Sequence, residues 1–411
     1  MQQSILGVSP LLMGMALLMV GNGSLPTILA LRLAGAGEPT WLIGFVMAQY
    51  YVGIVLGTLY GHKLIFTVGH IRAFATFGST MSAVTLLHAF IVDPWAWAIF
   101  RFLVGACAVG MFMCVESWLS ERSDNTNRGQ VFSLYVIVIY LFQGIGQFLI
   151  QLPDATGFTI YMVVSVLMSL AIIPVAVTRV PAPVLPESSH FDFARLWRIS
   201  PTGMIVSLIS GVILGAFYGI GPVFAQLSGL DRADIAFFMS AVILGGLVLQ
   251  WPLGKFSDGR DRRDCIFAVN ILLVGVSLML AISVVGGMWF IVLATIFGAL
   301  SCSLYPLSVA YTNDYLGPED LVPAAGGLVM AHGIGAIAGP QLASLTIELI
   351  GPPGLFVFCA FVAAGTAGLI YWRIRWRDGP SLEDQVEFQV MPRTSPVASV
   401  FDPRGEYDDE I

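Results

Sequence analysis

The chain has 411 residues, of which 57% are hydrophobic and only 11% are charged, and its formal net charge is −7. Soluble domains carry about 25% charged residues, so this composition excludes a water-soluble protein of this size and indicates one that crosses a membrane many times. The net charge does not indicate an acidic ligand, because much of it lies in the C-terminal tail. Five cysteines fall in or beside apolar runs, which argues against a disulfide framework and against a paired-cysteine metal site.

A membrane-spanning helix needs about 20 mostly apolar residues. Twelve runs meet this requirement, and the first is too long for a cleaved signal peptide, so we expect it to be retained. The predicted spans are 7–31, 41–60, 73–92, 95–119, 131–151, 158–178, 202–226, 234–253, 265–286, 288–311, 324–350 and 355–373.

Four regions follow from these spans. Residues 1–178 form an N-terminal six-helix half, and residues 202–373 form a C-terminal six-helix half. Between them lies a cytoplasmic linker, residues 179–201, with three prolines. It ends in a predicted amphipathic helix at the membrane surface, for which an irregular segment is the alternative. The polar, proline-containing tail, residues 374–411, is predicted to be disordered, because it has little apolar surface to bury.

Three landmarks of the first half return in the second half in the same order. Their offsets are similar, 197, 196 and 189 residues, which indicates an ancient duplication. The pairs are Gly57 and Gly254, which open two polar loops; Pro26 and Pro222; and Gly144-Ile-Gly146 and Gly333-Ile-Gly335.

The distribution of basic residues predicts the orientation. With both termini in the cytoplasm, the cytoplasmic segments hold sixteen of the nineteen Lys and Arg residues. The outer loops then hold Arg32 and Arg232, and Arg101 lies within the membrane. Because basic loops stay on the cytoplasmic side, we expect a multi-pass protein of the bacterial inner (plasma) membrane with both termini inside.

The loop from Gly254 to Arg263 carries a motif. A glycine is followed four positions later by Asp258 and then by the paired bases Arg262 and Arg263. Together with the 6+6 repeat and an arginine motif at Arg101-Phe-Leu-Val-Gly105, this loop resembles the major facilitator superfamily. Gly69-His-Ile-Arg72 and Glu116 further resemble its YcaD-like bacterial branch, whereas the Gly-Pro motif of drug antiporters is missing from span 5.

The resemblance implies an all-α membrane fold with two six-helix halves around a central cavity, and with spans 3, 6, 9 and 12 outside it. It also implies a cytoplasmic gate, in which Asp258 and Arg262 hold that side closed through contacts with neighbouring helix ends. We assign Gly254, Asp258, Arg262 and Arg263 to this gate.

Polar side chains inside spans face a protein interior or a wet cavity. Span 5 places several of them three and four residues apart, on one helical face. The predicted cavity residues are Asn22, Gln49, Tyr50, Arg101, Tyr140, Gln143, Gln147, Tyr218, Tyr305 and His332. The alternative is that the glutamines only tie helices together by hydrogen bonds.

Three ionisable side chains in the spans have two open roles each. Glu116, near the cytoplasmic end of span 4, either carries protons or makes a structural ion pair with Lys63, Arg72, Arg122 or Arg128. His332 either couples protons or is a neutral, hydrogen-bonded side chain. Arg101 either binds an anionic part of the solute or is held by carbonyls and neighbouring polar groups.

These patterns predict a secondary active transporter, a symporter or antiporter, that moves a small organic solute by alternating access, with proton coupling as an option. A uniporter of a metabolite is the nearest alternative, and a non-transporting receptor or scaffold belongs to a different class. Motifs of hydrolases and phosphate loops are missing, so we expect no enzyme, no catalytic residues, no cofactor and no metal site. The expected partners are the solute, protons and the lipid bilayer, with no nucleic acid, and the expected state is a monomer.

Overall fold

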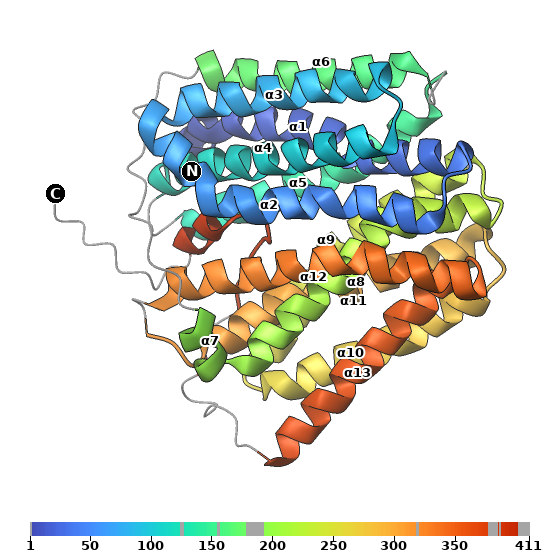
Figure 1. Cartoon of the computed structure of the whole chain (residues 1–411). Coiled ribbons are helices and arrows are strands. Elements are labelled where there is room, and N and C mark those ends of the chain that lie inside the picture. The colour runs from blue at the N-terminus through green and yellow to red at the C-terminus, as the bar shows by residue number, and fades with distance from the viewer. Residues whose placement is uncertain are drawn as a thin grey trace.

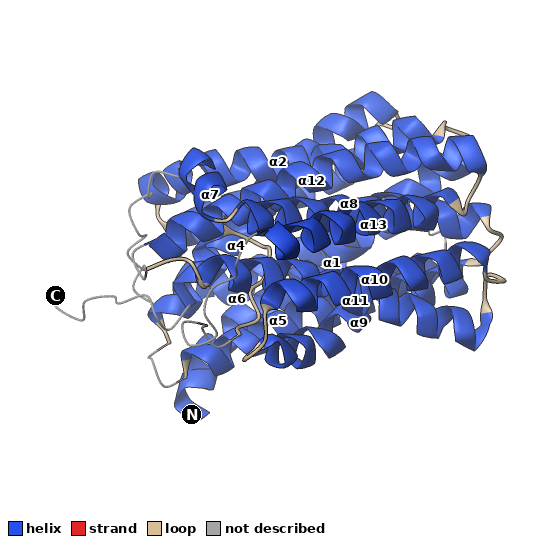
Figure 2. Ribbon diagram, turned by 90° about the horizontal axis from the view of Figure 1, so that it is seen from below, coloured by secondary structure: helices blue, strands red, loops and turns tan. Residues whose placement is uncertain are grey.

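The computed structural model describes residues 2–123, 127–153, 157–177, 193–317, 320–376, 385 and 388–401. In this part of the chain every long element is an α-helix, and the helices run side by side (Figures 1 and 2). The start of α1 and the end of α13 lie at the same end of the bundle (Figure 1). We call this end, with the loop that joins α9 to α10, the basic end.

Among the described residues, twelve helices are long and apolar enough to cross a membrane, which confirms the predicted number of spans. They are α1 (Gln2–Gly35), α2 (Thr40–Val68), α3 (His70–Phe90), α4 (Pro94–Glu121), α5 (Arg128–Gly146), α6 (Phe158–Val177), α8 (Pro201–Leu227), α9 (Arg232–Ser257), α10 (Arg262–Ile282), α11 (Gly287–Asn313), α12 (Leu321–Ile350) and α13 (Gly354–Trp376).

Helices α2 and α9 are among those that extend further at the basic end than the sequence predicts. The predicted spans end at residues 60 and 253, whereas α2 continues to Val68 and α9 to Ser257. Polar residues do not end a helix that has left the membrane, because its backbone hydrogen bonds remain intact. The helices stop where the backbone turns, just before Gly69 (φ +83°) and shortly before Gly259 (φ +71°). Such positive φ values are easily adopted by glycine.

The fifth predicted span also differs in its last turn. Instead of one α-helix to residue 151, α5 ends at Gly146 and a 3₁₀ segment, η1 (Gln147–Gln151), follows. Short 3₁₀ segments are frequent at helix termini. Here the segment starts at Gln147, whose side chain makes hydrogen bonds with α1, as described below.

The two halves have the same internal packing. In the first half α1 packs on α5, α2 on α4 and α3 on α6. The second half repeats this scheme with α8 on α12, α9 on α11 and α10 on α13. In Figure 1 the first half, blue to green, lies above the second half, yellow to orange. The predicted repeat is therefore a structural repeat.

Glycines allow close helix packing in both halves. A Cβ atom on Gly105 of α4 would lie 2.0 Å from the carbonyl oxygen of Tyr50 on α2. Likewise, a Cβ atom on Gly211 of α8 would lie 1.9 Å from the carbonyl oxygen of His332 on α12. Only a residue without a side chain fits at either position, so these glycines fix how closely the paired helices approach.

The halves contact each other along α2 and α12, α5 and α9, and α1 and α8. At the end opposite the basic end, the backbone N–H of Trp41 donates to Glu348 Oε1 at 2.9 Å. Near the middle, Gln250 Nε2 of α9 donates to the Tyr140 hydroxyl of α5 at 2.7 Å. The two halves are thus directly joined in the middle and at the opposite end.

The linker and the tail differ in how much the structure describes. The predicted amphipathic helix is present as α7 (Phe193–Ile199), and its Arg195 makes an ion pair of 2.7 Å with Asp320 at the start of α12. Residues 178–192 of the linker lie outside the described residues.

The structure differs from the expectation of a disordered tail at residues 388–401, which lie between the two halves at the basic end and finish in a 3₁₀ segment, η3 (Pro396–Phe401). Phe388, Met391 and Ala398 are buried there. The prediction considered only whether the tail could fold alone, and this segment buries its apolar side chains against the helix bundle instead. The rest of the tail after α13, apart from Gln385, lies outside the described residues.

Candidate functional site

A cavity of about 140 Å³ lies between the two halves. It is lined by side chains of α1, α2, α4 and α5 from the first half, of α8 and α12 from the second half, and of the tail segment. Helices α3, α6, α10 and α13 do not contribute to this lining, as the resemblance implied. The solute site, if it lies here, is therefore formed jointly by both halves.

Seven of the ten predicted cavity residues line this space. They are Asn22, Tyr50, Arg101, Tyr140, Gln143, Tyr218 and His332. These seven come from six different helices, and the structure brings them together around a single volume.

Three predicted cavity residues lie elsewhere. Gln49 donates to the carbonyl of Phe45 one turn earlier in α2. Gln147 accepts from the Thr27 hydroxyl at 2.7 Å and donates to the carbonyl of Gly23 at 2.8 Å, so it ties α1 to the end of α5. This is the helix-tying role that the sequence left open. Tyr305 lines a neighbouring small cavity, and its ring centroid is 5.3 Å from that of His332.

Arg101 is a buried cation at the cavity wall, with 2% of its surface exposed. Its guanidinium carbon lies 4.4 Å from the ring centroid of Tyr50. Within the described part of the chain, its Nε and Nη1 atoms have no hydrogen-bond partner. The Tyr50 hydroxyl accepts from Asn22 Nδ2 at 3.2 Å. Arg101 therefore combines a stacking contact with unused donors at a buried site.

Glu116 is fully buried on α4 and is surrounded by hydroxyl groups. The Tyr135 hydroxyl donates to its Oε1 atom at 2.8 Å. Thr394 donates to Oε1 and Ser395 to Oε2, both from the tail. The ion pairs between described residues do not include Glu116, so the expected pair with Lys63, Arg72, Arg122 or Arg128 is not seen there. Hydroxyl donors occupy both of its oxygens instead.

His332 lines the cavity from α12 and is 7% exposed. Its Nδ1 atom has no hydrogen-bond partner in the described part of the chain. Its ring meets Tyr305 edge to face. The side chain thus keeps one ring nitrogen available beside the cavity.

Several residues at the site were not predicted. Tyr51 lines the cavity beside Tyr50, and Gln250 joins the halves through Tyr140. Gln250 had a signal, because it is a glutamine inside an apolar run. The tail residues Arg393, Thr394 and Ser395 had none, because hydroxyl and basic residues in a polar tail do not indicate where that tail docks.

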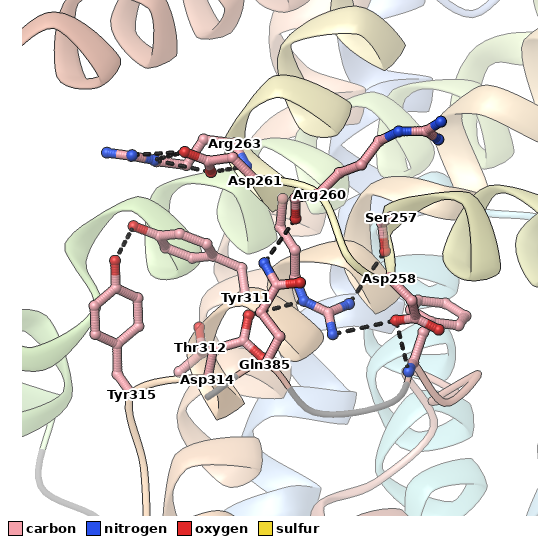
Figure 3. A network of polar contacts seen from close by, with 12 residues as sticks. Ser257, Asp258, Arg260, Asp261, Arg263, Tyr311, Thr312, Asp314, Tyr315 and Gln385 are labelled. Carbon is pink, nitrogen blue, oxygen red and sulfur yellow. Dashed lines mark hydrogen bonds and ion pairs between the residues drawn. The ribbon is translucent and has the colours of Figure 1, made fainter. Parts of the chain in front are cut away.

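Two of the predicted gate residues, Asp258 and Arg262, meet Ser257 and Asp314 at the basic end, in contacts that lie within the second half (Figure 3). Arg262 Nε donates to Asp314 Oδ2 at 2.8 Å, and these side chains are 1% and 0% exposed. Nη1 of Arg262 donates to the Ser257 hydroxyl at 3.1 Å, and Nη2 lies 3.4 Å from Asp258 Oδ1. Arg262 therefore connects the ends of α9 and α11. We call Ser257, Asp258, Arg262 and Asp314 the gate cluster.

The second arginine of the motif faces a different partner. Arg263 makes an ion pair of 2.6 Å with Asp261, the residue that caps α10. Nearby, the Tyr311 and Tyr315 hydroxyls lie 2.9 Å apart (Figure 3). Burial, and then the hydrogen bond with Tyr311, raises the pKa of the Tyr315 phenol, so it stays protonated at neutral pH. Arg263 thus stabilises its own helix start and is not part of the gate cluster.

Twelve membrane-spanning helices in two similarly packed halves, with a cavity between them, define the class of membrane transporters that hold a solute between two domains. The sequence model of the Major Facilitator Superfamily matches residues 11–286 and 203–401, and the chain belongs to this family. It is therefore a transporter and not an enzyme.

Relatives in several bacteria are similar over most of the chain. An uncharacterized MFS-type transporter of Enterobacter sp. (strain 638) is 28% identical over 359 residues, which cover 86% of this chain and 92% of the relative. The uncharacterized MFS-type transporter YcaD of Escherichia fergusonii is 27% identical over the same shares. The predicted YcaD-like branch is thereby confirmed.

Solved structures share the fold at low sequence identity. The nucleoside transporter NupG has a TM-score of 0.74 at 14% identity, over 90% of this chain and 100% of its own. A bacterial homolog of the human lysosomal transporter Spinster, in an inward-facing and unoccupied conformation, has a TM-score of 0.72 at 10% identity, over 93% of this chain and 98% of its own. These likenesses concern the fold.

Proposed function

We propose that this chain is a secondary transporter that carries a small organic solute with an acidic group across the bacterial inner membrane by alternating access, coupled to protons. The observation that carries the solute class is Arg101, a buried guanidinium beside the cavity with two unpartnered donor atoms in the described part of the chain.

An arginine inside a membrane protein is costly unless it is compensated, by at least about 2.5–3.5 kcal/mol on insertion scales. The Tyr50 ring supplies part of the compensation through a cation–π contact. The planar guanidinium fork matches a carboxylate or phosphate group. The described lining of this cavity contains Arg101 and no Asp or Glu, so its charge favours an anionic group.

Alternating access requires two halves that part at one end at a time. At the end opposite the basic end the halves touch directly, through the Trp41–Glu348 hydrogen bond and through Phe148 and Phe237, whose rings are 5.0 Å apart. At the basic end the tail segment lies between them. With the basic end in the cytoplasm, as the distribution of Lys and Arg predicts, this conformation is closed towards the outside.

Glu116 is the group to which we assign proton coupling. A buried carboxylate without a cation beside it is costly to keep charged, and its described contacts are hydroxyl groups. Protonation changes one of its oxygens from an acceptor into a donor. This lets a proton change the contacts that α4, the helix that also carries Arg101, makes with its neighbours.

Uptake into proteoliposomes tests the proposal. The panel pairs small carboxylic acids with amides or esters of the same size, each with and without an inward pH gradient. We expect saturable uptake of an acid, competition by other acids, and stimulation by the gradient. Uptake of neutral analogues that acids do not inhibit would overturn the solute class. Saturable uptake at the same rate with and without the pH gradient would identify a uniporter instead.

A further inference from the structure

We propose that residues 388–398 are a built-in ligand of the solute cavity: the segment enters between the halves at the basic end, occupies the solute path and inhibits transport until it leaves. The proposal rests on the transport function proposed above. Its basis is a chain of contacts that starts at the gate cluster, crosses the cavity and ends at Glu116.

The segment first binds the gate motif. The backbone N–H of Phe388 donates to Asp258 Oδ1 at 3.0 Å (Figure 3). The Phe388 ring lies where any side chain on Gly254 would be, since a Cβ atom there would come 1.9 Å from the ring. Gln385 anchors the approach through a hydrogen bond of 2.6 Å to the carbonyl of Arg260. The glycine and the aspartate of the family motif are thus also the receptor for this segment.

The middle of the segment lies inside the cavity. Arg393 donates to the Tyr218 hydroxyl at 3.3 Å. Its guanidinium carbon is 5.8 Å from the ring centroid of Tyr140 and 5.9 Å from that of Tyr218, within the range of cation–π contacts. Tyr140 belongs to the first half and Tyr218 to the second. Pro392, Arg393 and Thr394 line the same volume as Arg101 and His332, so segment and solute compete for one space.

The end of the segment binds Glu116, the carboxylate to which we assign proton coupling. The hydroxyls of Thr394 and Ser395 donate to the two oxygens of Glu116. Ser395 is 1% exposed and Ala398 is 2% exposed, so the contact is enclosed by protein. With the segment docked, both carboxylate oxygens are engaged at once.

These contacts join the two halves. The segment holds Asp258 and Tyr218 of the second half and Tyr140 and Glu116 of the first half. Closing the basic end brings these halves together in the volume that the segment fills, and closely packed interiors do not compress. The segment must therefore leave before the transporter completes a cycle.

Two truncations test the inhibition. A chain that ends at Trp376 lacks the segment, whereas a chain that ends at Phe401 keeps it and lacks only the residues beyond, which makes it the matched control. We expect initial uptake by the chain ending at Trp376 to rise about tenfold, the change that a 1.4 kcal/mol penalty on leaving the docked state would produce. Uptake by the chain ending at Phe401 should equal that of the full chain. Equal or lower uptake by the chain ending at Trp376 would overturn the inhibition.

A second measurement reads docking without any solute. The five native cysteines are buried with the segment docked, but Cys302 Sγ lies 4.0 Å from Arg393 Nη2. Ala398→Cys is therefore introduced together with Cys302→Ser, and provides a reporter for a membrane-impermeant maleimide once the segment leaves. We expect slow labelling in the full chain. Labelling should become about tenfold faster with Thr394→Ala and Ser395→Ala together, because two hydrogen bonds to a buried carboxylate are lost.

The uptake and labelling measurements distinguish the docking of the segment from the proposed transport function. Fast labelling of Ala398→Cys in the otherwise unchanged full chain would show that the segment is not docked and would overturn this inference, while transport of acids would still stand. If labelling is slow and the two substitutions accelerate it, the segment is docked. If the same chains transport no solute of the panel, that result counts against the proposed solute class.

Discussion

Arg262 and Asp314 form a buried ion pair, with Nε and Oδ2 2.8 Å apart and neither side chain more than 1% exposed. The pair joins the start of α10 to the end of α11, and the same guanidinium reaches the last residues of α9. Three helix ends of the second half are therefore fixed to one arginine, which makes this half a rigid unit at the basic end.

Asp314→Asn tests this rigidity. Removing one partner of a buried pair leaves an uncompensated charge and typically costs about 3–5 kcal/mol. We expect a clear fall in the thermal unfolding midpoint of the purified protein. Asp261→Asn is the control, because Asp261 is 27% exposed and its pair with Arg263 is screened by water. Equal effects of the two substitutions would contradict the special role of the buried pair.

Arg101→Lys tests the anion site. Lysine keeps the positive charge but loses the planar fork that binds a carboxylate at two points. We expect the variant to fold in normal amounts, as judged by size-exclusion chromatography, and to lose at least about 90% of uptake per folded molecule, a loss of about 1.4 kcal/mol in solute binding. A proportional loss of folded protein and uptake would make Arg101 a structural residue.

Glu116→Gln tests proton coupling. Glutamine has the shape of a protonated glutamate and no titratable proton. We expect solute exchange across the membrane to continue, whereas accumulation driven by a pH gradient disappears. Two pH values that give different uptake rates in the wild type should give equal uptake rates in the variant. Accumulation against a gradient in Glu116→Gln would assign coupling to another residue, with His332 the next to test.

Gly105→Ala tests the packing that positions Arg101. A Cβ atom at Gly105 would lie 2.0 Å from the Tyr50 carbonyl oxygen, so α4 must move away from α2. We expect a loss of stability of about 1–3 kcal/mol, the usual cost of overpacking, and weaker solute binding. Gly61→Ala, on α2 with its nearest atom at an ordinary 3.6 Å, is the matched control. A tolerated Gly105→Ala would show that the two helices can separate freely.

The number of spans, their pairing into two halves and most of the polar residues of the cavity wall were predictable, because each depends on one local signal. An apolar run predicts a membrane span, and a polar side chain inside that run, such as Asn22 or Tyr218, predicts a residue that lines the cavity. Helix ends at the basic side were not predictable from apolarity, since α2 continues through His62 and Lys63 to Val68. Gln147 illustrates a further limit. The spacing of polar residues along a helix predicts the side of the helix to which a side chain points, but the group that it contacts there depends on the tertiary packing.

The partners of charged residues were predicted least well. Asp314 follows the predicted span 288–311, and its pairing with Arg262 needs α10 and α11 to be adjacent. For Glu116, an ion pair with a base of the neighbouring loops was one of the two predicted roles. Glu116 meets Thr394 and Ser395 instead, 278 and 279 residues later in the chain. Contacts over such separations leave no pattern in a single sequence.

The position of residues 388–398 after the last span also has a consequence for biosynthesis. All twelve spans are translated before this segment, so the ribosome releases it after the helices have been inserted. The bundle thus assembles around an open cavity and receives its internal ligand last. A newly made molecule therefore passes through a stage in which the cavity is complete and the segment has not yet docked.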